Sequence, residues 1–425
     1  MDKILTVSII GCGSRGFHAY GTLINQLKDK FKIVALCDID EEVLGIVSKE
    51  LGVSAENCYS SDDEFFKARR SDVLVIATLD KQHYGHALQA LNLGYDILLE
   101  KPITDNEQEC LDLLEAQKKH QNKVVVCHVL RYAKAFVKVK ELIDEGAIGQ
   151  LVNIQALEQV AYWHVAHSYV RGNWRRSEET TPMILAKCCH DLDLLQYYAQ
   201  SKAKNVSSLG DCTYFNKENA PKDATYRCSD CPRKDTCVYS AKLIYIDRFL
   251  TAEKQFENSW PFNVVVKDFP VTKEKLEREL YGDSIYGRCV FYCDNNVVSH
   301  QTTNVLFENG VTASLTMMGF TGSGGRIYRF FGTTGEIVLD EDVGTIEIKT
   351  FGEKTDVINV GDLTEAGMAH GGGDAQLIEQ LYNMIMGTAI SGTTLEGSIE
   401  SHLMGIAAEK SRLNSGENIE VHAKR

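Results

Sequence analysis

The first 127 residues alternate short apolar runs with segments of helical periodicity. Continuous apolar runs are typical of strands buried on both faces of a parallel sheet, with helices covering those faces. The expected strands are Ile4–Ile10, Ile33–Asp38, Asp72–Ala77, Tyr95–Leu99 and Lys123–Cys127. The expected helices are Phe17–Leu27, Glu41–Leu51, Gln82–Leu93 and Asn106–His120. This order predicts an N-terminal α/β domain with a doubly wound Rossmann sheet over residues 1–127.

The pattern changes after a predicted helix at Phe136–Glu145 and the glycines Gly146 and Gly149. Longer strands follow, and Asn309-Gly310 between two of them is a hairpin signal. The expected strands are Leu151–Val160, Val305–Phe307, Thr312–Met318, Ile327–Phe331, Glu336–Leu339 and Thr345–Thr350. The expected helices are Pro182–Tyr198, Asp374–Met386 and Leu395–Arg412. Residues 128–425 are therefore predicted to form a C-terminal α+β domain with a mostly antiparallel open sheet, interrupted by an insertion at about 214–290.

Composition and charge exclude several classes of partner. The formal net charge of −14 disfavours nucleic acids and anionic membrane surfaces, because both would repel the chain. No apolar run reaches the roughly 18–20 residues that span a bilayer, and the first residues fit a buried strand better than a signal peptide. Thirteen scattered cysteines fit reduced thiols. We expect a soluble cytoplasmic protein.

A glycine-rich fingerprint follows the first predicted strand. Gly11-Cys12-Gly13-Ser14-Arg15-Gly16 opens a predicted helix, where glycines allow a tight turn and close backbone approach, and the helix start offers N–H groups to a pyrophosphate. Asp38 ends the second strand, where a carboxylate accepts hydrogen bonds from ribose hydroxyls and repels a 2′-phosphate. NAD is therefore favoured, while Arg15 keeps NADP as the alternative. The other interpretation is a glycine turn with a surface aspartate beyond it.

A lysine follows another strand at the same edge of the predicted sheet. Glu100-Lys101-Pro102 comes directly after Tyr95–Leu99, at the carboxyl edge where doubly wound folds bind ligands. An ammonium there can stabilise a developing alkoxide or transfer a proton. Taken alone, an ordinary lysine at a strand end is the favoured interpretation.

Several segments together resemble a known family. They are Gly11–Gly16, the segment 78–83, Glu100-Lys101-Pro102, the turn at 146–149 and the segment 332–336. In order and spacing they are similar to the glucose–fructose oxidoreductase and inositol dehydrogenase family (Gfo/Idh/MocA). The resemblance implies NAD(P)-dependent chemistry on sugars or inositols, with Lys101 assisting proton transfer. It also places Thr78, Asp80, His83 and Glu100 in the cofactor site.

The same resemblance points to a second catalytic motif at 185–193. His190 stands at the family's His/Tyr position and Asp193 at its following carboxylate. Ala186 stands where the family usually has an aspartate, with Lys187 beside it. Helical spacing from Ile184 to Tyr198 would put Ala186, His190 and Asp193 on one face. His190 is the expected acid/base partner of Lys101, and Lys187 and Asp193 are expected substrate contacts; a packed core histidine is the alternative.

The stretch 163–176 is rich in groups that bind sugars. Trp faces cover C–H surfaces, while His and Arg side chains bind hydroxyls or an acid group. The candidates are His164, His167, Arg171 and Trp174, with His128 and Arg131 as contacts at the margin of the site. A polar loop packed between domains is an equally good interpretation.

A cysteine cluster lies inside the predicted insertion. Cys228-x-x-Cys231 and Cys237 could supply three ligands to a structural zinc ion, with Cys212, Cys289 or Cys293 as the fourth. An iron–sulfur cluster, free thiols and a redox disulfide are the alternatives.

These patterns predict an NAD-dependent enzyme that moves a hydride between nicotinamide and a hydroxyl-bearing or keto carbon of a small carbohydrate. One alternative is an NAD-dependent enzyme that cleaves glycosides through a transient keto-sugar. Another is a non-catalytic NAD or sugar sensor. An exposed sheet face in the second domain would suit a homodimer or homotetramer.

Overall fold

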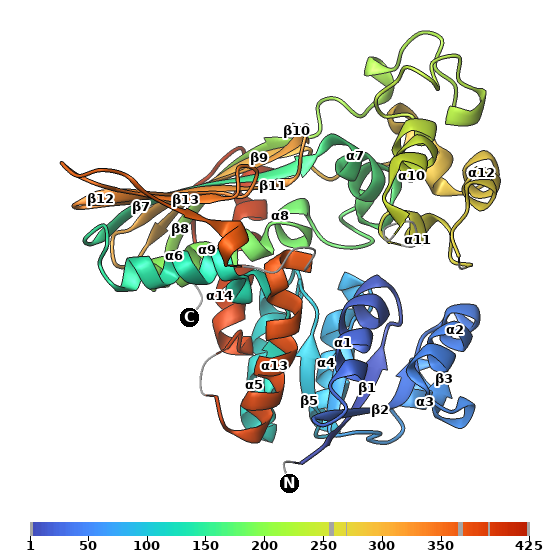
Figure 1. The fold of residues 1–425 in the computed structure, drawn as a ribbon, viewed down its shortest axis with the longest axis horizontal. Helices are drawn as coiled ribbons and strands as arrows, with labels where there is room; N and C mark the ends of the chain where they lie inside the picture. Colours follow the sequence, from blue (N-terminus) through green and yellow to red (C-terminus); the bar gives the residue numbers. More distant parts are fainter. Residues whose placement is uncertain (1–2, 255–258, 269, 364–368, 390–391, 423–425) are drawn as a thin grey trace.

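Two sheets of different construction organise the chain. The computed structural model describes residues 3–254, 259–268, 270–363, 369–389 and 392–422. A six-stranded sheet lies in the N-terminal part and a nine-stranded sheet in the remainder (Figure 1). The predicted fold class is confirmed.

The first sheet is parallel throughout, with the strand order β3-β2-β1-β4-β5-β6 of a doubly wound domain. Its strands carry almost continuous apolar sequence because helices cover both faces. They are β1 (Leu5–Ile10), β2 (Phe31–Cys37), β3 (Cys58–Tyr59), β4 (Val73–Ile76), β5 (Asp96–Leu99) and β6 (Val124–Val126). The helices are η1 (Ser14–Gly21), α1 (Thr22–Gln26), α2 (Glu41–Leu51), α3 (Asp62–Phe65), α4 (His83–Asn92) and α5 (Glu107–His120).

The second sheet has the order β14-β13-β12-β11-β7-β10-β9-β8-β15. β7 and β10 run parallel, and the other neighbours in the described part of this sheet are antiparallel. Its strands are β7 (Leu151–Ala161), β8 (Ala203–Asp211), β9 (His300–Phe307), β10 (Thr312–Thr321), β11 (Gly325–Gly332), β12 (Gly335–Asp340), β13 (Thr345–Thr350), β14 (Asp356–Asn359) and β15 (Ile419–Glu420). The predicted hairpin joins β9 to β10, with Gly310 at φ 87°.

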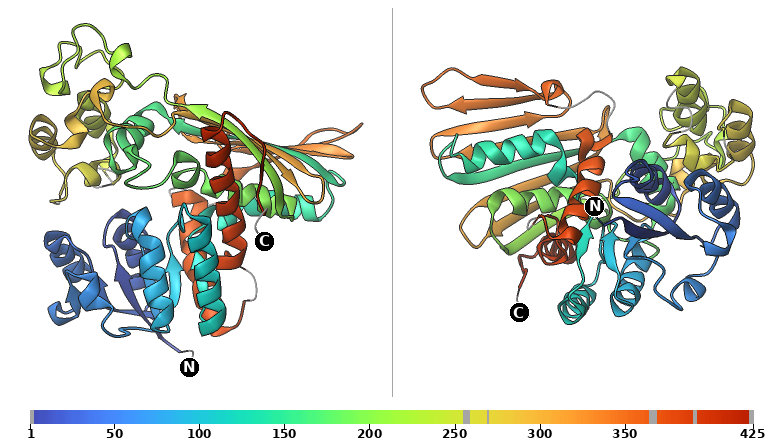
Figure 2. Two further views of the ribbon diagram at one scale, coloured as in Figure 1. Left: turned by 180° about the vertical axis from the view of Figure 1, so that it is seen from behind. Right: turned by 60° about the horizontal axis from the view of Figure 1, so that its bottom comes forward.

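Helices cover one face of the second sheet. They are α6 (Lys134–Asp144), α8 (Met183–Ala186), α9 (Cys189–Ala199) and α14 (Leu395–Leu413), and two views place them on the same side (Figures 1 and 2). Strand residues alternate accordingly: Val305 and Phe307 of β9 are buried, while Asn304 and Leu306 point to the uncovered face.

One predicted helix is wrong in its continuity. The segment Pro182–Tyr198 is two helices, α8 and α9, separated at Lys187 and Cys188. Cys188 has φ −90° and ψ 4°, outside helical geometry. The carbonyl of Ala186 accepts a hydrogen bond from Lys101 Nζ at this break. The helical spacing expected for Ala186, His190 and Asp193 therefore does not hold.

The chain between β8 and β9 forms a separate lobe of short helices (Figure 1). The longer ones are η9 (Lys242–Asp247), α10 (Arg248–Thr251), α11 (Phe262–Val265) and α12 (Lys273–Tyr281). The lobe reaches the first domain through an ion pair between Lys267 Nζ and Asp40 Oδ2 at 2.6 Å. We call this segment, 212–299, the insertion.

Helix α13 (Gly373–Met386) returns to the first domain although it lies near the chain's C-terminus. Leu377, Ile378 and Leu381 share a core with β1 and β2. Within the described ranges, no helix combines the length and apolarity that a bilayer crossing requires.

Candidate functional site

The fingerprint loop between β1 and η1 has the geometry of a dinucleotide cradle. Gly11 has φ 87°, and a Cβ there would lie 2.5 Å from the Ala77 carbonyl oxygen. A Cβ on Gly16 would lie 1.9 Å from the Gly11 carbonyl oxygen, so both positions require glycine. Around Gly13, by contrast, no described heavy atom lies within 4 Å of an added Cβ. The loop is closed where the chain packs on itself and open where a pyrophosphate would approach.

Asp38 lies directly after β2, beside this loop. Its carboxylate accepts hydrogen bonds from Cys12 N at 2.7 Å and from Asp40 N at 2.9 Å. The contact with Cys12 fixes the carboxylate against the fingerprint. Asp38 remains partly exposed, as a group that binds a ribose must be.

Arg15 points away from Asp38 and toward Glu100. Its Nε lies 2.7 Å from Glu100 Oε1, and its Nη2 lies 2.6 Å from Asp374 Oδ1 of α13. Burial alone would raise the pKa of Glu100, but Arg15, Lys101 and a hydrogen bond from Tyr20 hold that pKa below its ordinary value. Glu100 is therefore an internal anion that anchors the loop, and Ser14 opens the helix beside it.

Lys101 lies at the carboxyl end of β5, where the two domains meet. Its Nζ donates to the Ala186 carbonyl at 2.8 Å, and its backbone N–H donates to Glu100 Oε2. Among the described residues, no carboxylate lies within 4.0 Å of Lys101 Nζ. The ammonium group is therefore held by a neutral acceptor at the break between α8 and α9.

Side chains of the segment after β4 form hydrogen bonds with neighbouring parts of the protein at the carboxyl edge of the sheet. His83 Nδ1 lies 2.6 Å from the Pro102 carbonyl and His83 Nε2 lies 3.0 Å from the Thr78 carbonyl. The Asp80 carboxylate accepts hydrogen bonds from Trp174 Nε1 and Thr181 Oγ1. His83, Asp80 and the polar edge of Trp174 are thus occupied by protein partners.

Arg131 and Asp193 form a bidentate ion pair between the domains. The distances are 2.6 Å from Nε to Oδ2 and 2.7 Å from Nη2 to Oδ1. His128 is buried beside them, and burial lowers its pKa to about 4. Its ring lies 5.8 Å from the ring of His190, which is partly exposed on α9. His190 thus lies beside His128 and the Arg131–Asp193 pair.

The stretch 163–176 is divided between the site and the insertion. His164 packs with Trp163 and with Trp260 of the insertion, and Arg248 lies 3.8 Å above the Trp163 ring. Burial, followed by the charges of Lys187, His167 and Lys101, holds the pKa of His164 well below its ordinary value. The positive charges of both lysines thus oppose protonation of His164.

His167 and Arg171 lie deeper. His167 stacks on Tyr286 and contacts the Tyr245 hydroxyl at 2.9 Å. Arg171 is fully buried, and its guanidinium donates to the carbonyls of Arg288 and Tyr239. Both side chains anchor the insertion to the second domain and are not exposed to the space between the domains.

Glu158 is a site residue that sequence reasoning missed. It lies on β7 and is 1% exposed, and its Oε1 is 3.0 Å from Lys187 Nζ. Its Oε2 is 2.9 Å from Arg326 Nε, and Arg326 also pairs with Asp191. The alternation of β7, with Ile154, Ala156 and Val160 buried, places an acidic residue at a core-facing position. That pattern was the available signal, because a buried acid needs a partner.

The cysteine cluster does not form the predicted zinc site. All thirteen cysteines are free thiols, and Cys228, Cys231, Cys237 and Cys289 line one small cavity in the insertion. In the part of the chain that the structure describes, no group of three or more His, Cys, Asp or Glu side chains is arranged to hold a metal ion. The prediction of zinc is not supported.

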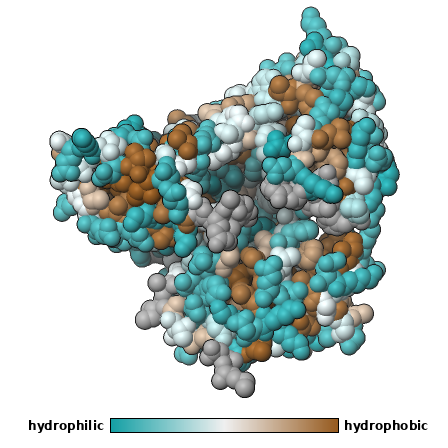
Figure 3. Space-filling view, in the orientation of Figure 1, coloured by the Kyte–Doolittle hydropathy of each residue, from teal (hydrophilic) through white to brown (hydrophobic). Residues whose placement is uncertain are grey.

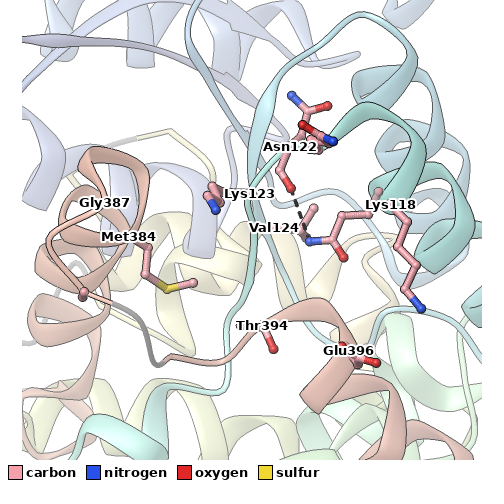
Figure 4. A pocket seen from close by; sticks show the side chains of 11 residues that line it. Lys118, Asn122, Lys123, Val124, Met384, Gly387, Thr394 and Glu396 are labelled. Carbon is pink, nitrogen blue, oxygen red and sulfur yellow. Dashed lines mark hydrogen bonds between the residues drawn. The ribbon is translucent and has the colours of Figure 1, made fainter.

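One cavity of the described structure lies away from Lys101. It has a volume of about 720 Å³ and lies among the end of α5, the start of β6 and the ends of α13 and α14 that face them (Figure 4). Val124 and Lys123 lie at the amino end of β6, the opposite edge of the sheet from Lys101. The face shown in Figure 3 is hollowed between the first domain and the parts above it.

Comparison with family models matches both domains. Residues 5–128 match the model described as "Oxidoreductase family, NAD-binding Rossmann fold", and residues 136–228 match the "GFO/IDH/MocA C-terminal domain". The chain is 25% identical over 394 residues to an oxidoreductase named YteT from Bacillus subtilis (strain 168), covering 88% of each chain. It is 24% identical over 204 residues to an inositol 2-dehydrogenase/D-chiro-inositol 3-dehydrogenase from Halalkalibacterium halodurans, covering 48% of this chain and 55% of that one.

Solved structures share the fold over the whole length. An oxidoreductase from Agrobacterium radiobacter, solved with NAD+, L-tartaric acid and magnesium, superposes with a TM-score of 0.69 at 15% identity, covering 100% of both chains. A levoglucosan dehydrogenase, solved with NADH and levoglucosan, has a TM-score of 0.69 at 15% identity, covering 99% of this chain and 100% of that one. The expected homo-oligomer and cytoplasmic location stay predictions.

Proposed function

Because the chain belongs to the GFO/IDH/MocA family of NAD-binding oxidoreductases, we propose that it transfers a hydride between nicotinamide and a hydroxyl-bearing or keto carbon of a sugar, polyol or glycoside. One observation carries the proposal. Lys101 Nζ stands at the carboxyl edge of the Rossmann sheet, bonded to the Ala186 carbonyl, where the two domains meet. In this fold, ligands bind outside that edge.

The fingerprint loop and Asp38 are the cofactor-binding residues. The open space at Gly13 admits a pyrophosphate, and the free edge of the Asp38 carboxylate accepts ribose hydroxyls. NAD, when bound, supplies the hydride acceptor. We assign NAD rather than NADP because Arg15 is engaged by Glu100 and Asp374 and does not face Asp38. An Asp38→Ser variant should therefore narrow the preference for NAD over NADP in fluorescence titrations.

Proton transfer falls to Lys101 and His190. Oxidation of an alcohol carbon requires the hydroxyl proton to leave: the Lys101 ammonium stabilises the developing alkoxide by donating a hydrogen bond to its oxygen, and the imidazole of His190 accepts the proton. Ala186 has only a methyl side chain, so proton transfer cannot continue through that position. Asp80 and His83 act indirectly, because their polar atoms brace Trp174, Thr181, Pro102 and Thr78.

The test is a panel of polyols, aldoses and glycosides with NAD, following both NADH absorbance and products. Lys101→Met should lower turnover by about 10²–10⁴-fold, the usual contribution of a positioned acid or base. NADH affinity should stay within about threefold, because the lysine does not touch the fingerprint. Lys123→Met, which removes an exposed lysine at the opposite sheet edge, is the matched control. Full activity of the Lys101 variant would remove this lysine from the chemistry.

A further inference from the structure

A buried network of charges stands behind the break between α8 and α9. Glu158 of β7 pairs with Lys187 at 3.0 Å and with Arg326 of β11 at 2.9 Å. Arg326 Nε also lies 2.8 Å from Asp191 Oδ1, which accepts a further hydrogen bond from the Tyr328 hydroxyl. Three segments far apart in the sequence thus contribute to one network.

Lys187 is the most exposed of the four charged members of this network. Its side chain is 22% exposed, whereas the side chains of Glu158, Asp191 and Arg326 are 10% exposed or less. Arg326 contacts both carboxylates, so that with Lys187 the network contains two positive and two negative groups. The ammonium group of Lys187 has three donor hydrogens. In the described part of the chain, the carboxylate within 4.0 Å of Lys187 Nζ is that of Glu158. Lys187 therefore has donors to offer to a ligand.

Lys187 lies next to the proposed catalytic lysine. Lys101 Nζ binds the carbonyl of Ala186, and the peptide that starts at this carbonyl continues into Lys187. The charges of both lysines act on the imidazole of His164. The two lysines thus meet the same break between α8 and α9, Lys101 through its hydrogen bond to the Ala186 carbonyl and Lys187 through its own backbone.

We propose that Lys187 binds a second hydroxyl of the substrate while the reacting hydroxyl lies at Lys101, and that Glu158 is the positioning residue that holds Lys187 in place. The inference rests on the function proposed above. It narrows the substrate class to compounds with a further hydroxyl beside the reacting carbon, as in sugars and inositols, and excludes simple secondary alcohols.

Glu158 makes this arrangement sensitive to pH. Burial is the main reason that the pKa of Glu158 is raised to about 6, with Asp191 adding to the rise and Arg326 and Lys187 opposing it. The ionisable groups around Glu158 are Lys187, Cys188 and Asp191 from the broken helix, Arg326 from β11 and Tyr169 from η5 (Val165–Arg171). Below that pH a protonated Glu158 no longer holds the ammonium as an ion pair, so substrate binding should weaken.

The experiment uses the NAD-loaded enzyme and the panel compound that the wild type oxidises fastest, together with its deoxy analogue lacking the neighbouring hydroxyl. Lys187→Met should raise KM for the full substrate about 10- to 100-fold, the range for losing a hydrogen bond to a charged group, and change kcat much less. For the deoxy analogue, wild type and variant should have the same KM. Lys187→Arg should recover part of the loss.

Glu158→Gln tests the positioning role. In the wild type KM should rise as pH falls through about 6, and in the Gln variant KM should be higher and flat across that range. Glu341→Gln is the matched control, because Glu341 lies 3.9 Å from Arg326 and forms no ion pair with Lys187. Thermal unfolding and NADH titration establish that each variant is folded.

The outcomes separate the two proposals. If the wild type oxidises no compound of the panel, the proposed function fails and this inference fails with it. If turnover depends on Lys101 but Lys187→Met affects the full substrate and the deoxy analogue equally, only this inference is overturned. A pH profile that Glu158→Gln leaves unchanged would likewise overturn the role of Glu158.

Discussion

The nucleotide end and the substrate end of this molecule are built from different kinds of contact. At the nucleotide end the decisive features are backbone conformation and close approach, as at Gly11 and Gly16. At the substrate end they are pairs of charged side chains, such as Lys187–Glu158 and Arg131–Asp193. The first kind is set by glycines of one loop, although Gly11 also closely approaches Ala77 after β4. The second kind joins residues that are tens of positions or more apart.

This difference decides how each end tolerates change. A clash with the backbone at the nucleotide end cannot relax without moving a strand or a helix start. At the substrate end, loss of one partner leaves a buried charge behind, and the cost depends on which partner is removed. The nucleotide end should therefore lose stability when a side chain is enlarged. The substrate end should lose stability when one partner of a charge pair is removed or when the pH changes.

The largest effect is expected from Gly16→Ala. Its Cβ would lie 1.9 Å from the Gly11 carbonyl oxygen, so the variant should lose about 3 kcal/mol or more of stability. The Cβ of Gly13→Ala would have no heavy atom within 4 Å, so the free energy of unfolding of this variant should lie within about 0.5 kcal/mol of the wild-type value. Its methyl group should still weaken NAD binding about tenfold, or 1.4 kcal/mol, by filling the cradle. Urea unfolding and fluorescence titration measure both; equal stability of the two variants would contradict the steric account.

The same contrast explains what the sequence could predict. Five strands of the first domain, the fingerprint and the Asn309-Gly310 hairpin were readable because each depends on neighbouring residues, whereas the two-residue strand β3 was not predicted. The break at Lys187–Cys188 was not, because it involves a hydrogen bond from Lys101, 85 positions away in sequence. Local periodicity alone favoured one continuous helix.

Residue type misled the sequence analysis where a side chain could serve either a ligand or the protein. Arg171 fits a sugar contact by its chemistry, but the insertion packs over it and supplies carbonyl partners. The zinc expected at Cys228, Cys231 and Cys237 followed from spacing, and the described structure does not support it. Glu158 was hidden inside a strand that otherwise reads as ordinary core.

Asp193→Ala should have the next largest effect. It leaves the Arg131 guanidinium without its buried carboxylate, and breaking such a pair costs about 3–5 kcal/mol. Glu141→Ala is the matched control, because its ion pair with Lys138 is exposed and contributes about 1 kcal/mol at most. Denaturant midpoints compare the two. A loss at Asp193 no greater than that at Glu141 would mean that the buried charges of the substrate end do not govern its stability.

A pH series should show a smaller effect at the same end. Burial lowers the pKa of His128 to about 4 and of His402 to about 3, while the unfolded chain titrates near 6.5. Between these values the unfolded state binds more protons, so stability falls as pH falls, by about 1.4 kcal/mol per pH unit for each histidine. The contribution is complete above pH 6.5 and is lost progressively toward pH 4.

His128→Leu tests how much one of these two histidines contributes to the pH dependence of stability. In the described structure neither ring nitrogen of His128 has a hydrogen-bond partner, so an apolar side chain can replace it. Urea unfolding at several pH values measures how the free energy of unfolding depends on pH. Between pH 6.5 and 4 this slope should be smaller for the variant than for the wild type, because the variant takes up about one proton fewer on unfolding. Parallel curves for the two proteins would show that His128 is not a buried neutral group.

The smallest effect is expected where the insertion touches the nucleotide end. Lys267 and Asp40 form an ion pair whose side chains are 61% and 30% exposed, so Lys267→Ala should cost about 1 kcal/mol at most. NAD affinity should change by less than about threefold, and less again at high salt. Lys273→Ala removes the same charge from the insertion without touching the first domain, since Lys273 pairs with Glu277 of its own helix. A tenfold loss of NAD affinity in the Lys267 variant alone would mean that the insertion completes the cofactor site through Asp40, which lies two residues beyond Asp38. The distinction between a nucleotide end built from backbone contacts and a substrate end built from charge pairs would then no longer hold.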